Sequence, residues 1–258
     1  MPELPDIELY LVRLRERFLG KTLIGLKIYS PFVLRSFDVK PVETEGLAVE
    51  SVERLGKRIV LGLQGDLYVV IHLMIAGRLN WQSPLPAEKR TLGKTVLAAF
   101  RFENGQLTLV ESSTKKRASI HLVRGRAGLD EHRRKGIDIF TAPLALFTEK
   151  LVSTNRTLKR ALTDPNSFDG IGNAYSDEIL FWAKLSPVRR TSSLTEDEIE
   201  RLLGGCRKTL FEWKERLLGL YPGFPKPGDI TAFRPDFAVH GKFRQPCPVC
   251  GQPIQHIV

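Results

Sequence analysis

Pro2 and Glu3 stand directly after the initiator methionine and are the first pair of residues that could do chemistry. Once Met1 is removed, Pro2 exposes a secondary α-amine. An α-amine titrates near about pH 8 and is a better nucleophile at neutral pH than a lysine side chain. Attack of this nitrogen on a sugar C1′ would leave an iminium, an electron sink like a lysine Schiff base. Glu3 is placed to relay protons. Many proteins begin with Met-Pro, so Pro2 taken alone is better explained as an ordinary structural residue.

The segment FDGIGN, residues 168–173, predicts a phosphate site. Gly170 and Gly172 permit a tight turn whose amides point outward. Asn173 then begins a helix, where N–H groups and the helix dipole attract anions. A plain glycine-containing connection between two helices explains the same letters equally well.

Two groups of basic residues could add contacts to phosphates. Lys115, Lys116 and Arg117 form the tip of a hairpin in SSTKKRASIH, and Arg156 and Lys159 lie upstream of GIGN. Lysine and arginine contacts to phosphate fix a protein on nucleic acid without reading its sequence. The alternative is that these side chains belong to a solvated charged surface.

The three cysteines are too few for a disulfide framework. Cys206 lies in an apolar helical pattern and is expected in the core. Cys247 and Cys250 form a CxxC pair, as in zinc sites, but a closed structural zinc site needs four ligands. His256 is the remaining candidate ligand nearby.

Composition and charge restrict the class of protein. The length of 258 residues favours two compact units. No apolar run of about 18 residues is present, which excludes a transmembrane helix, and the acidic, mixed N-terminus is not a signal peptide. An intracellular location, in the cytoplasm or nucleoid, is therefore expected. The net charge of +10 and the pI of about 9.6 favour a polyanionic partner over a merely basic protein.

The first half of the chain predicts one helix followed by an antiparallel sandwich or barrel. Apolar residues recur at helical spacing over 6–19, with Asp6 as N-cap and Gly20 just past the end. Asn104-Gly105 between two strand-like segments is a hairpin signal. The expected strands cover residues 22–30, 57–63, 66–74, 94–102, 106–112 and 117–123.

The second half predicts helices. Residues 124–142 are polar and basic, as in a linker or exposed loop, and helices are expected over 144–163, 173–184 and 196–218. Thr195 and Glu198 form a capping box before the last of these. Residues 221–235 are rich in proline and glycine, and the tail from Phe237 is expected to form a small hairpin around CPVC.

Five segments occur in an order that resembles the formamidopyrimidine-DNA glycosylase / endonuclease VIII (Fpg/Nei) family. They are MPELPDIE, GKRIVL, IHLMIAGRL, GIGNAYSDEILFWAKLSP and VHGKFRQPCPVCGQPI, and the resemblance covers nearly the whole chain, from residue 2 to residue 258. The resemblance implies that Pro2 is the Schiff-base nucleophile and Glu3 the catalytic acid. It also implies that Lys57 contacts phosphate and assists β-elimination. Without the resemblance, Lys57 would be an ordinary charged residue at a strand start.

The resemblance also assigns DNA contacts. Gly172 and Asn173 match the helix-two-turn-helix that grips DNA, with Arg156 and Lys159 as additional contacts. The hairpin at 115–117 matches the loop that enters the duplex when the damaged base is flipped out, and Ile75, beside Met74, matches a second wedge. The hairpin lacks the phenylalanine typical of the oxidised-purine enzymes, so the preferred lesion is left open between oxidised purines and oxidised pyrimidines.

In the family, a four-cysteine zinc finger follows. Cys247 and Cys250 supply two of the four ligands for a structural Zn²⁺, and His256 does not fit the family spacing. The second CxxC and the finger arginine that supports δ-elimination are absent. We therefore expect the sequence to be a fragment rather than a protein with a non-functional finger.

The expected protein is an α+β multidomain enzyme. Its predicted parts are a catalytic β-sandwich domain with a leading helix (1–130), a linker (131–143), a helix-two-turn-helix domain (144–235) and an incomplete zinc-finger hairpin (236–258). The expected activity is base-excision repair by a monomeric DNA glycosylase and AP lyase acting on damaged double-stranded DNA, with no membrane partner. The alternatives are a non-catalytic lesion- or abasic-site-binding protein of the same fold and, from charge alone, an RNA-binding protein.

Overall fold

The computed structural model describes residues 1–87 and 92–257, which form two compact units. The first unit contains Met1–Pro2, Asp6–Arg133 and Leu217–Ile230, and the second contains Glu3–Pro5, Arg134–Arg216 and Thr231–Val258. Neither unit is one continuous piece of chain. The sequence-based boundaries place residues 217–230 in the helical domain, whereas the contacts of this segment belong to the sheet unit.

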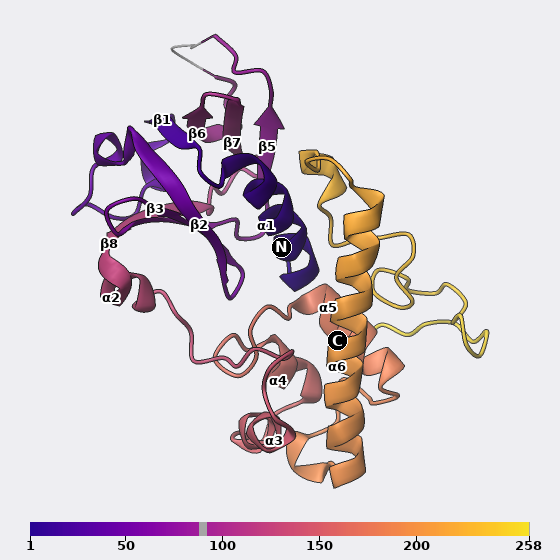
Figure 1. The fold of residues 1–258 in the computed structure, drawn as a ribbon. Coiled ribbons are helices and arrows are strands. Elements are labelled where there is room, and N and C mark those ends of the chain that lie inside the picture. The colour runs from indigo at the N-terminus through magenta and orange to yellow at the C-terminus, as the bar shows by residue number, and fades with distance from the viewer. Residues whose placement is uncertain (88–91, 258) are drawn as a thin grey trace. The chain divides into compact units, whose positions relative to one another are not determined.

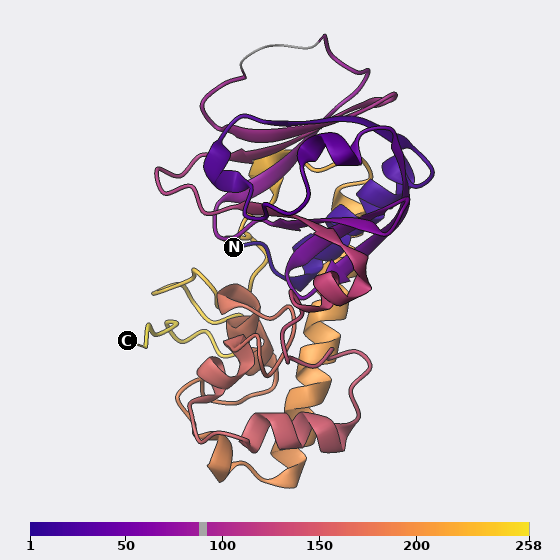
Figure 2. The same cartoon turned by 90° about the vertical axis from the view of Figure 1, so that its left-hand side faces the viewer.

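The first unit contains an eight-stranded antiparallel sheet (Figures 1 and 2). The strand order is β5-β7-β6-β1-β2-β3-β4-β8. The strands are β1 (Thr22–Ile28), β2 (Leu47–Leu55), β3 (Arg58–Leu63), β4 (Leu67–His72), β5 (Gly77–Gln82), β6 (Val96–Phe102), β7 (Gly105–Glu111) and β8 (Ser119–Arg124). Short 3-10 helices η1 (Pro31–Val33) and η2 (Pro41–Thr44) lie between β1 and β2, and η4 (Pro227–Asp229) lies in the unit's last segment, Leu217–Ile230.

One apolar core joins the two halves of the sheet to helix α1 (Leu4–Phe18). Phe100 and Leu107 from one half and Leu61 and Ile71 from the other are all fully buried in this core, as the sandwich prediction requires. Helix α1 begins at Leu4, so Asp6 lies in its first turn and the predicted N-cap role of Asp6 is wrong. A carboxylate in the first turn still interacts favourably with the helix dipole.

The predicted turn signals around the sheet are confirmed. Gly20 follows α1 with a φ of 73°, a conformation that favours glycine. The hairpin at Asn104-Gly105 joins β6 to β7, with Phe102 paired to Gly105.

Two strands and one helix of this unit are not predicted by the sequence. In strand β2 the buried residues lie three positions apart, with glutamates and an arginine between them, and β5 carries Arg78, Asn80 and Gln82. Both strands are stabilised by pairing with neighbouring strands, β2 with β3 and β5 with β7. The local sequence pattern does not show this pairing, so it does not predict these two strands. Helix α2 (Gly125–Asp130) occupies part of the segment 124–142, which the sequence predicts as a linker or exposed loop. Its Leu129 packs in a separate cluster with Val60 and Val70.

The second unit is helical. It contains α3 (Leu144–Val152), α4 (Leu158–Thr163), α5 (Asn173–Trp182), the short η3 (Thr191–Ser193) and most of α6 (Glu196–Leu220). The predicted single helix over 144–163 is wrong, because the chain breaks after Val152 and resumes at Leu158. Thr157 is extended there, and Leu158 donates its backbone N–H to Arg189 O rather than to a preceding turn.

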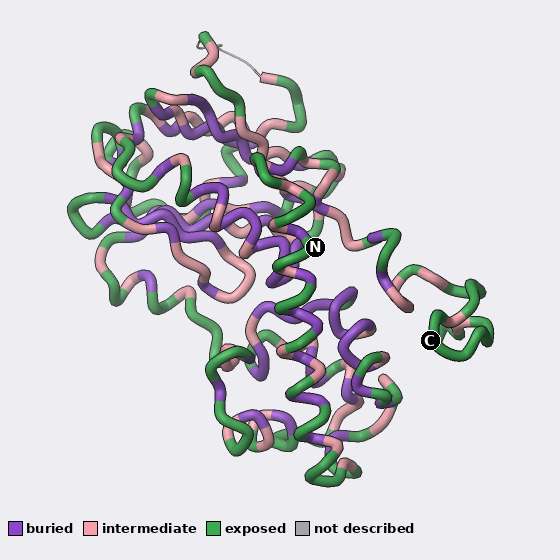
Figure 3. The backbone as a smooth tube through the Cα atoms, turned by 45° about the vertical axis from the view of Figure 1, so that its right-hand side comes forward, coloured by how far each residue is buried: buried purple, intermediate pink, exposed green. Residues whose placement is uncertain are grey.

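Helix α6 agrees with its sequence pattern. Thr195 N donates to Glu198 at 2.9 Å and Glu198 N donates to Thr195 Oγ1 at 3.4 Å, which confirms the capping box. Cys206 is fully buried in the helical core, as predicted. Figure 3 shows the buried stretches of both units. In the described part of the chain, no helix combines the length and apolar character needed to cross a membrane.

Candidate active site

The carboxylate of Glu3 accepts three backbone hydrogen bonds at the start of helix α5. Gly172 N donates to Oε2 at 2.6 Å, Ala174 N to Oε1 at 2.9 Å and Tyr175 N to Oε2 at 3.2 Å. Glu3 is only 3% exposed. Amide donors and the positive end of the helix dipole both stabilise an ionised carboxylate, so Glu3 is held as a charged, oriented group.

This arrangement corrects the expected use of the GIGN turn. The amides of Gly172, Ala174 and Tyr175 do not point outward, because they donate to Glu3. A phosphate contact through the amide of Gly172 is therefore replaced by an internal carboxylate. Asn173 does begin the helix, as predicted; its contact with DNA stays a prediction.

The two glycines of this turn are required by close approach. A Cβ at Gly172 would lie 2.5 Å from Glu3 Cδ, and one at Gly170 would lie 2.7 Å from the side chain of Leu4. Gly170 also has a φ of 85°, whereas the backbone of Gly172 is extended. The second glycine is thus needed for space alone, to admit the Glu3 carboxylate.

We expect Gly172→Ala to destabilise the protein by about 1–3 kcal/mol, the usual effect of forcing a methyl group into a filled space. Gly204→Ala is the matched control, because a Cβ at this exposed position of α6 meets nothing within 4 Å. The control should gain roughly 0.5–1 kcal/mol from helix propensity. Thermal unfolding of the full chain measures both; equal shifts in the two variants would contradict the proposed crowding.

Pro2 and Lys57 both belong to the first unit. Pro2 is buried and immediately precedes the anchored Glu3 in the chain. Lys57 is half-buried in the two-residue turn between β2 and β3, where Leu55 pairs with Arg58. Gly56, the other turn residue, has a φ of 61°. Lys57 therefore extends from a tight turn rather than from the strand start itself.

The basic hairpin is organised by a carboxylate that the sequence reasoning missed. Glu111, 1% exposed at the end of β7, accepts hydrogen bonds from Arg117 N at 2.9 Å and Ala118 N at 3.0 Å. Lys116 donates to the main-chain oxygen of Glu111. The ammonium of Lys116 is therefore turned inward, while Lys115 and Arg117 are exposed.

The loop after β4 presents Ile75. This side chain is 58% exposed, and Met74 before it has a φ of 52°. A positive φ is uncommon outside glycine; here Met74 N donates to His72 Nδ1 at 3.0 Å and Gly77 N to Leu73 O at 2.9 Å. The exposed position of Ile75 suits the wedge role that remains a prediction for it.

Two further predicted cations are paired within the second unit. Arg156 binds Asp164 at 2.7 Å, and Lys159 binds Asp177 and also approaches Asn173 O at 3.4 Å. Asp177 in turn contacts His240 at 2.8 Å. Although burial acts to raise it, the hydrogen bonds with His240 and Lys159 hold the pKa of Asp177 below its usual value. Neither cation is a simple solvated side chain.

Glu178 is a second buried carboxylate that, like Glu3, accepts three backbone hydrogen bonds. It is 1% exposed and accepts backbone hydrogen bonds from Ala238 (2.8 Å), Val239 (2.9 Å) and His240 (2.9 Å). A glutamate at a buried position of α5 is the signal that could have revealed it, because a buried carboxylate needs donors.

The cysteine pair does not complete a metal site. Backbone N–H groups of Cys250 and Val249 lower the pKa of Cys247, which suits a thiolate ligand, and Pro246 pairs with Pro253 in the predicted small hairpin. Across residues 1–87 and 92–257, however, no group of three or more His, Cys, Asp or Glu side chains could hold a metal ion. His256 does not join the pair, so the residues present do not fit the four-ligand zinc site of the family.

Known protein families match both units. Residues 1–118 match the formamidopyrimidine-DNA glycosylase N-terminal domain, and residues 139–213 match the formamidopyrimidine-DNA glycosylase H2TH domain. A formamidopyrimidine-DNA glycosylase from Thermus thermophilus is 32% identical over 266 residues, covering 100% of this chain and 94% of the relative. One from Bacillus cereus is 30% identical with the same coverage.

Solved structures give the same result. The Lactococcus lactis Fpg (MutM) in complex with DNA containing N7-benzyl-Fapy-dG has a TM-score of 0.85 and 26% identity, over 99% of this chain and 94% of that one. A MutM complex with DNA containing carbocyclic 8-oxo-G has a TM-score of 0.83 and 25% identity over the same shares. The predicted fold class, a sheet domain and a helix-two-turn-helix domain, is thereby confirmed.

Proposed function

The chain belongs to the Fpg/Nei family of DNA glycosylases, and from this premise we propose that it removes oxidised bases from damaged double-stranded DNA and then nicks the abasic strand. The observation that carries the proposal is the anchored Glu3 carboxylate directly after Pro2. Three amide hydrogen bonds hold the Glu3 carboxylate, a proton-transfer group, in place. The preceding residue, Pro2, supplies the amine nucleophile. Base removal through an amine nucleophile requires a proton-transfer group of this kind, whereas lesion binding alone does not require one.

In the proposed first step, the Pro2 nitrogen displaces the damaged base from C1′ of the sugar. The Pro2 nitrogen attacks C1′, the glycosidic bond breaks, and the base leaves with the bonding electrons and takes a proton from water. Glu3 accepts the proton released from the Pro2 nitrogen and delivers it to the ring oxygen O4′ as the C1′–O4′ bond opens. The product is an iminium between Pro2 and C1′.

The proposed second step is β-elimination. The iminium acidifies the C2′ proton, which passes to water, and the C–H electrons form an enamine. The enamine expels the 3′ phosphate with the electrons of the C3′–O bond and leaves an unsaturated iminium on Pro2. Lys57 is proposed to contact phosphate during this step. Asn173, Lys115 and Arg117 are proposed to hold the DNA backbone, whose contacts position the duplex without reading its sequence. We propose that a monomer carries out both steps.

Borohydride trapping on a duplex with one abasic site tests this function. Reduction should convert the iminium into a stable protein–DNA adduct, and peptide mapping should place it on the Pro2 nitrogen. Tight binding to abasic DNA without any adduct would instead support the non-catalytic lesion-binding alternative. A panel of duplexes with single oxidised purines or pyrimidines then identifies the preferred lesion.

A further inference from the structure

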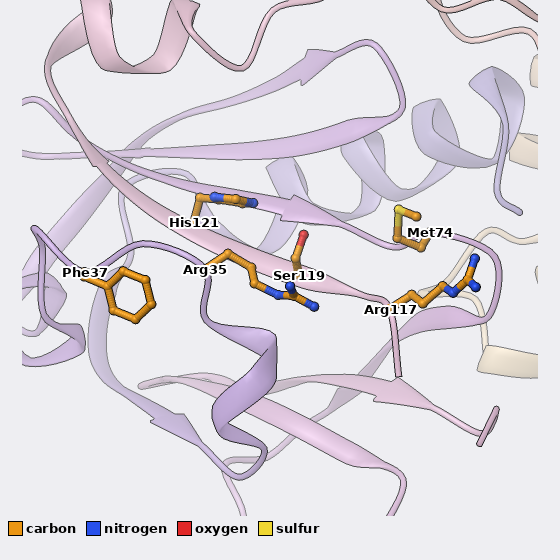
Figure 4. Close-up of a pocket in the computed structure, with 6 residues that line it drawn as sticks. All are labelled: Arg35, Phe37, Met74, Arg117, Ser119 and His121. Atoms are coloured by element: carbon orange, nitrogen blue, oxygen red, sulfur yellow. The ribbon is translucent and has the colours of Figure 1, made fainter. Parts of the chain in front are cut away.

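A hollow in the first unit lies beside the basic hairpin, and of its lining residues only Arg117 has a role in the steps above. Its volume is about 680 Å³, and it is lined by Arg35, Phe37, Met74, Arg117, Ser119 and His121. Figure 4 shows Phe37 at one end and Arg117 at the other, with Arg35 and Ser119 between them. Small-molecule sites usually enclose roughly 300–1,000 Å³, so the volume is sufficient for one nucleotide.

The middle of this hollow and its Arg117 end suit a phosphate. Arg35 and Arg117 are both exposed, and neither guanidinium forms an ion pair with a carboxylate among residues 1–87 and 92–257. Guanidinium groups bind phosphate through paired N–H donors. Glu111 accepts hydrogen bonds from the backbone N–H groups of Arg117 and Ala118. These bonds fix the backbone of Arg117 beside the hollow.

The other end suits a planar base. Phe37 is 87% exposed, an unusual position for a large aromatic side chain unless it meets a partner. Exposed aromatic rings of this kind stack on nucleic-acid bases with little preference for which base it is. His121 and Ser119, two residues apart on β8, present polar atoms along the same wall.

His121 is available to contact a base edge. Burial, together with the positive charges of His132, Arg58 and Arg35, lowers the pKa of His121 to about 4. The ring is therefore neutral at pH 7 and offers one N–H donor and one acceptor nitrogen.

We propose that this hollow binds one nucleotide that has left the base stack near the lesion, with its phosphate on Arg35 and Arg117 and its base on Phe37. The inference rests on the proposed function, because it takes damaged duplex DNA as the ligand. The nucleotide has two possible sources, the strand opposite the lesion or the damaged strand next to it.

Duplexes containing tetrahydrofuran, a stable abasic analogue, and 2-aminopurine distinguish these sources. The fluorescent base is placed opposite the tetrahydrofuran, immediately 3′ of it, or five pairs away. Binding of the full chain should change the fluorescence at one of the first two positions and not at the third. The position that responds identifies the source of the nucleotide.

Variants tie the signal to the hollow. Phe37→Leu should remove most of the fluorescence change and weaken binding about 5- to 150-fold, the range associated with loss of one base–aromatic stack. Arg35→Ala should also remove most of the fluorescence change, through loss of the phosphate contact. Phe32→Leu is the matched control, because Phe32 is 75% exposed nearby but does not line the hollow. Lys21→Ala controls for the loss of one exposed positive charge.

Borohydride trapping on the same sequences with a true abasic site separates this inference from the proposed function. If wild type is trapped but Phe37→Leu and Arg35→Ala behave like the controls, the nucleotide site is wrong and the glycosylase function stands. If wild type is not trapped, the proposed chemistry fails, and the fluorescence of the variants still decides whether the hollow binds a nucleotide.

Discussion

Glu3→Gln is expected to slow base release about 10²- to 10⁴-fold, the range that a positioned proton-transfer group contributes. A glutamine cannot accept the proton from the Pro2 nitrogen, and its NH₂ group would face at least one of the three amides that now donate to Glu3. One buried N–H would lose its acceptor, which costs about 1–3 kcal/mol. The variant should therefore show both slower chemistry and lower stability.

Glu178→Gln separates these two effects. Glu178 is equally buried and also accepts three backbone hydrogen bonds, from residues 238–240. We expect a similar fall in the unfolding temperature for both variants, but a large loss of single-turnover base release, measured at saturating enzyme, only for Glu3→Gln. A Glu3→Gln rate within threefold of wild type would exclude proton transfer by this carboxylate.

Chains that retain Met1 are expected to form no borohydride adduct. In such chains the Pro2 nitrogen is a tertiary amide with no lone pair available for attack on C1′. The fraction of protein trapped on abasic DNA should therefore not exceed the fraction whose mass corresponds to a start at Pro2.

Preparations with different degrees of methionine removal, quantified by mass spectrometry, measure this dependence. DNA binding is the control, since the phosphate contacts proposed above do not involve the amine and should be equal in both forms. Trapping of a chain with intact Met1 would move the nucleophile to another amine, and peptide mapping would identify it.

The sequence predicts most of the local structure of this protein because its strongest signals are local. The capping box at Thr195 and Glu198, the turn at Gly20 and the hairpin at Asn104-Gly105 each depend on residues a few positions apart, and each is confirmed. The break between α3 and α4 is not predicted, because it depends on a hydrogen bond from Leu158 to the distant Arg189.

The same distinction applies to the site. The motifs bring Pro2, Glu3 and GIGN to attention, but a motif does not show which groups pair with each other. Glu3 and Gly172 are separated by 169 positions in the chain, and only the structure reveals that the turn amides serve this carboxylate. Glu111 and Glu178 were missed for the same reason: each binds backbone amides that carry no side-chain signature.

The return of residues 217–230 to the sheet unit has a consequence for synthesis on the ribosome. Leu217 and Ile230 are buried in the same core as α1 and the strands, and Tyr221 and Phe224 pack against that core. A chain is made from its N-terminus, and its domains generally fold as they emerge. Here the first unit lacks part of its core until residue 230 of 258 has left the exit tunnel. The apolar surface of the nascent sheet that Leu217 and Ile230 later cover therefore stays open to solvent or chaperones until this segment has emerged.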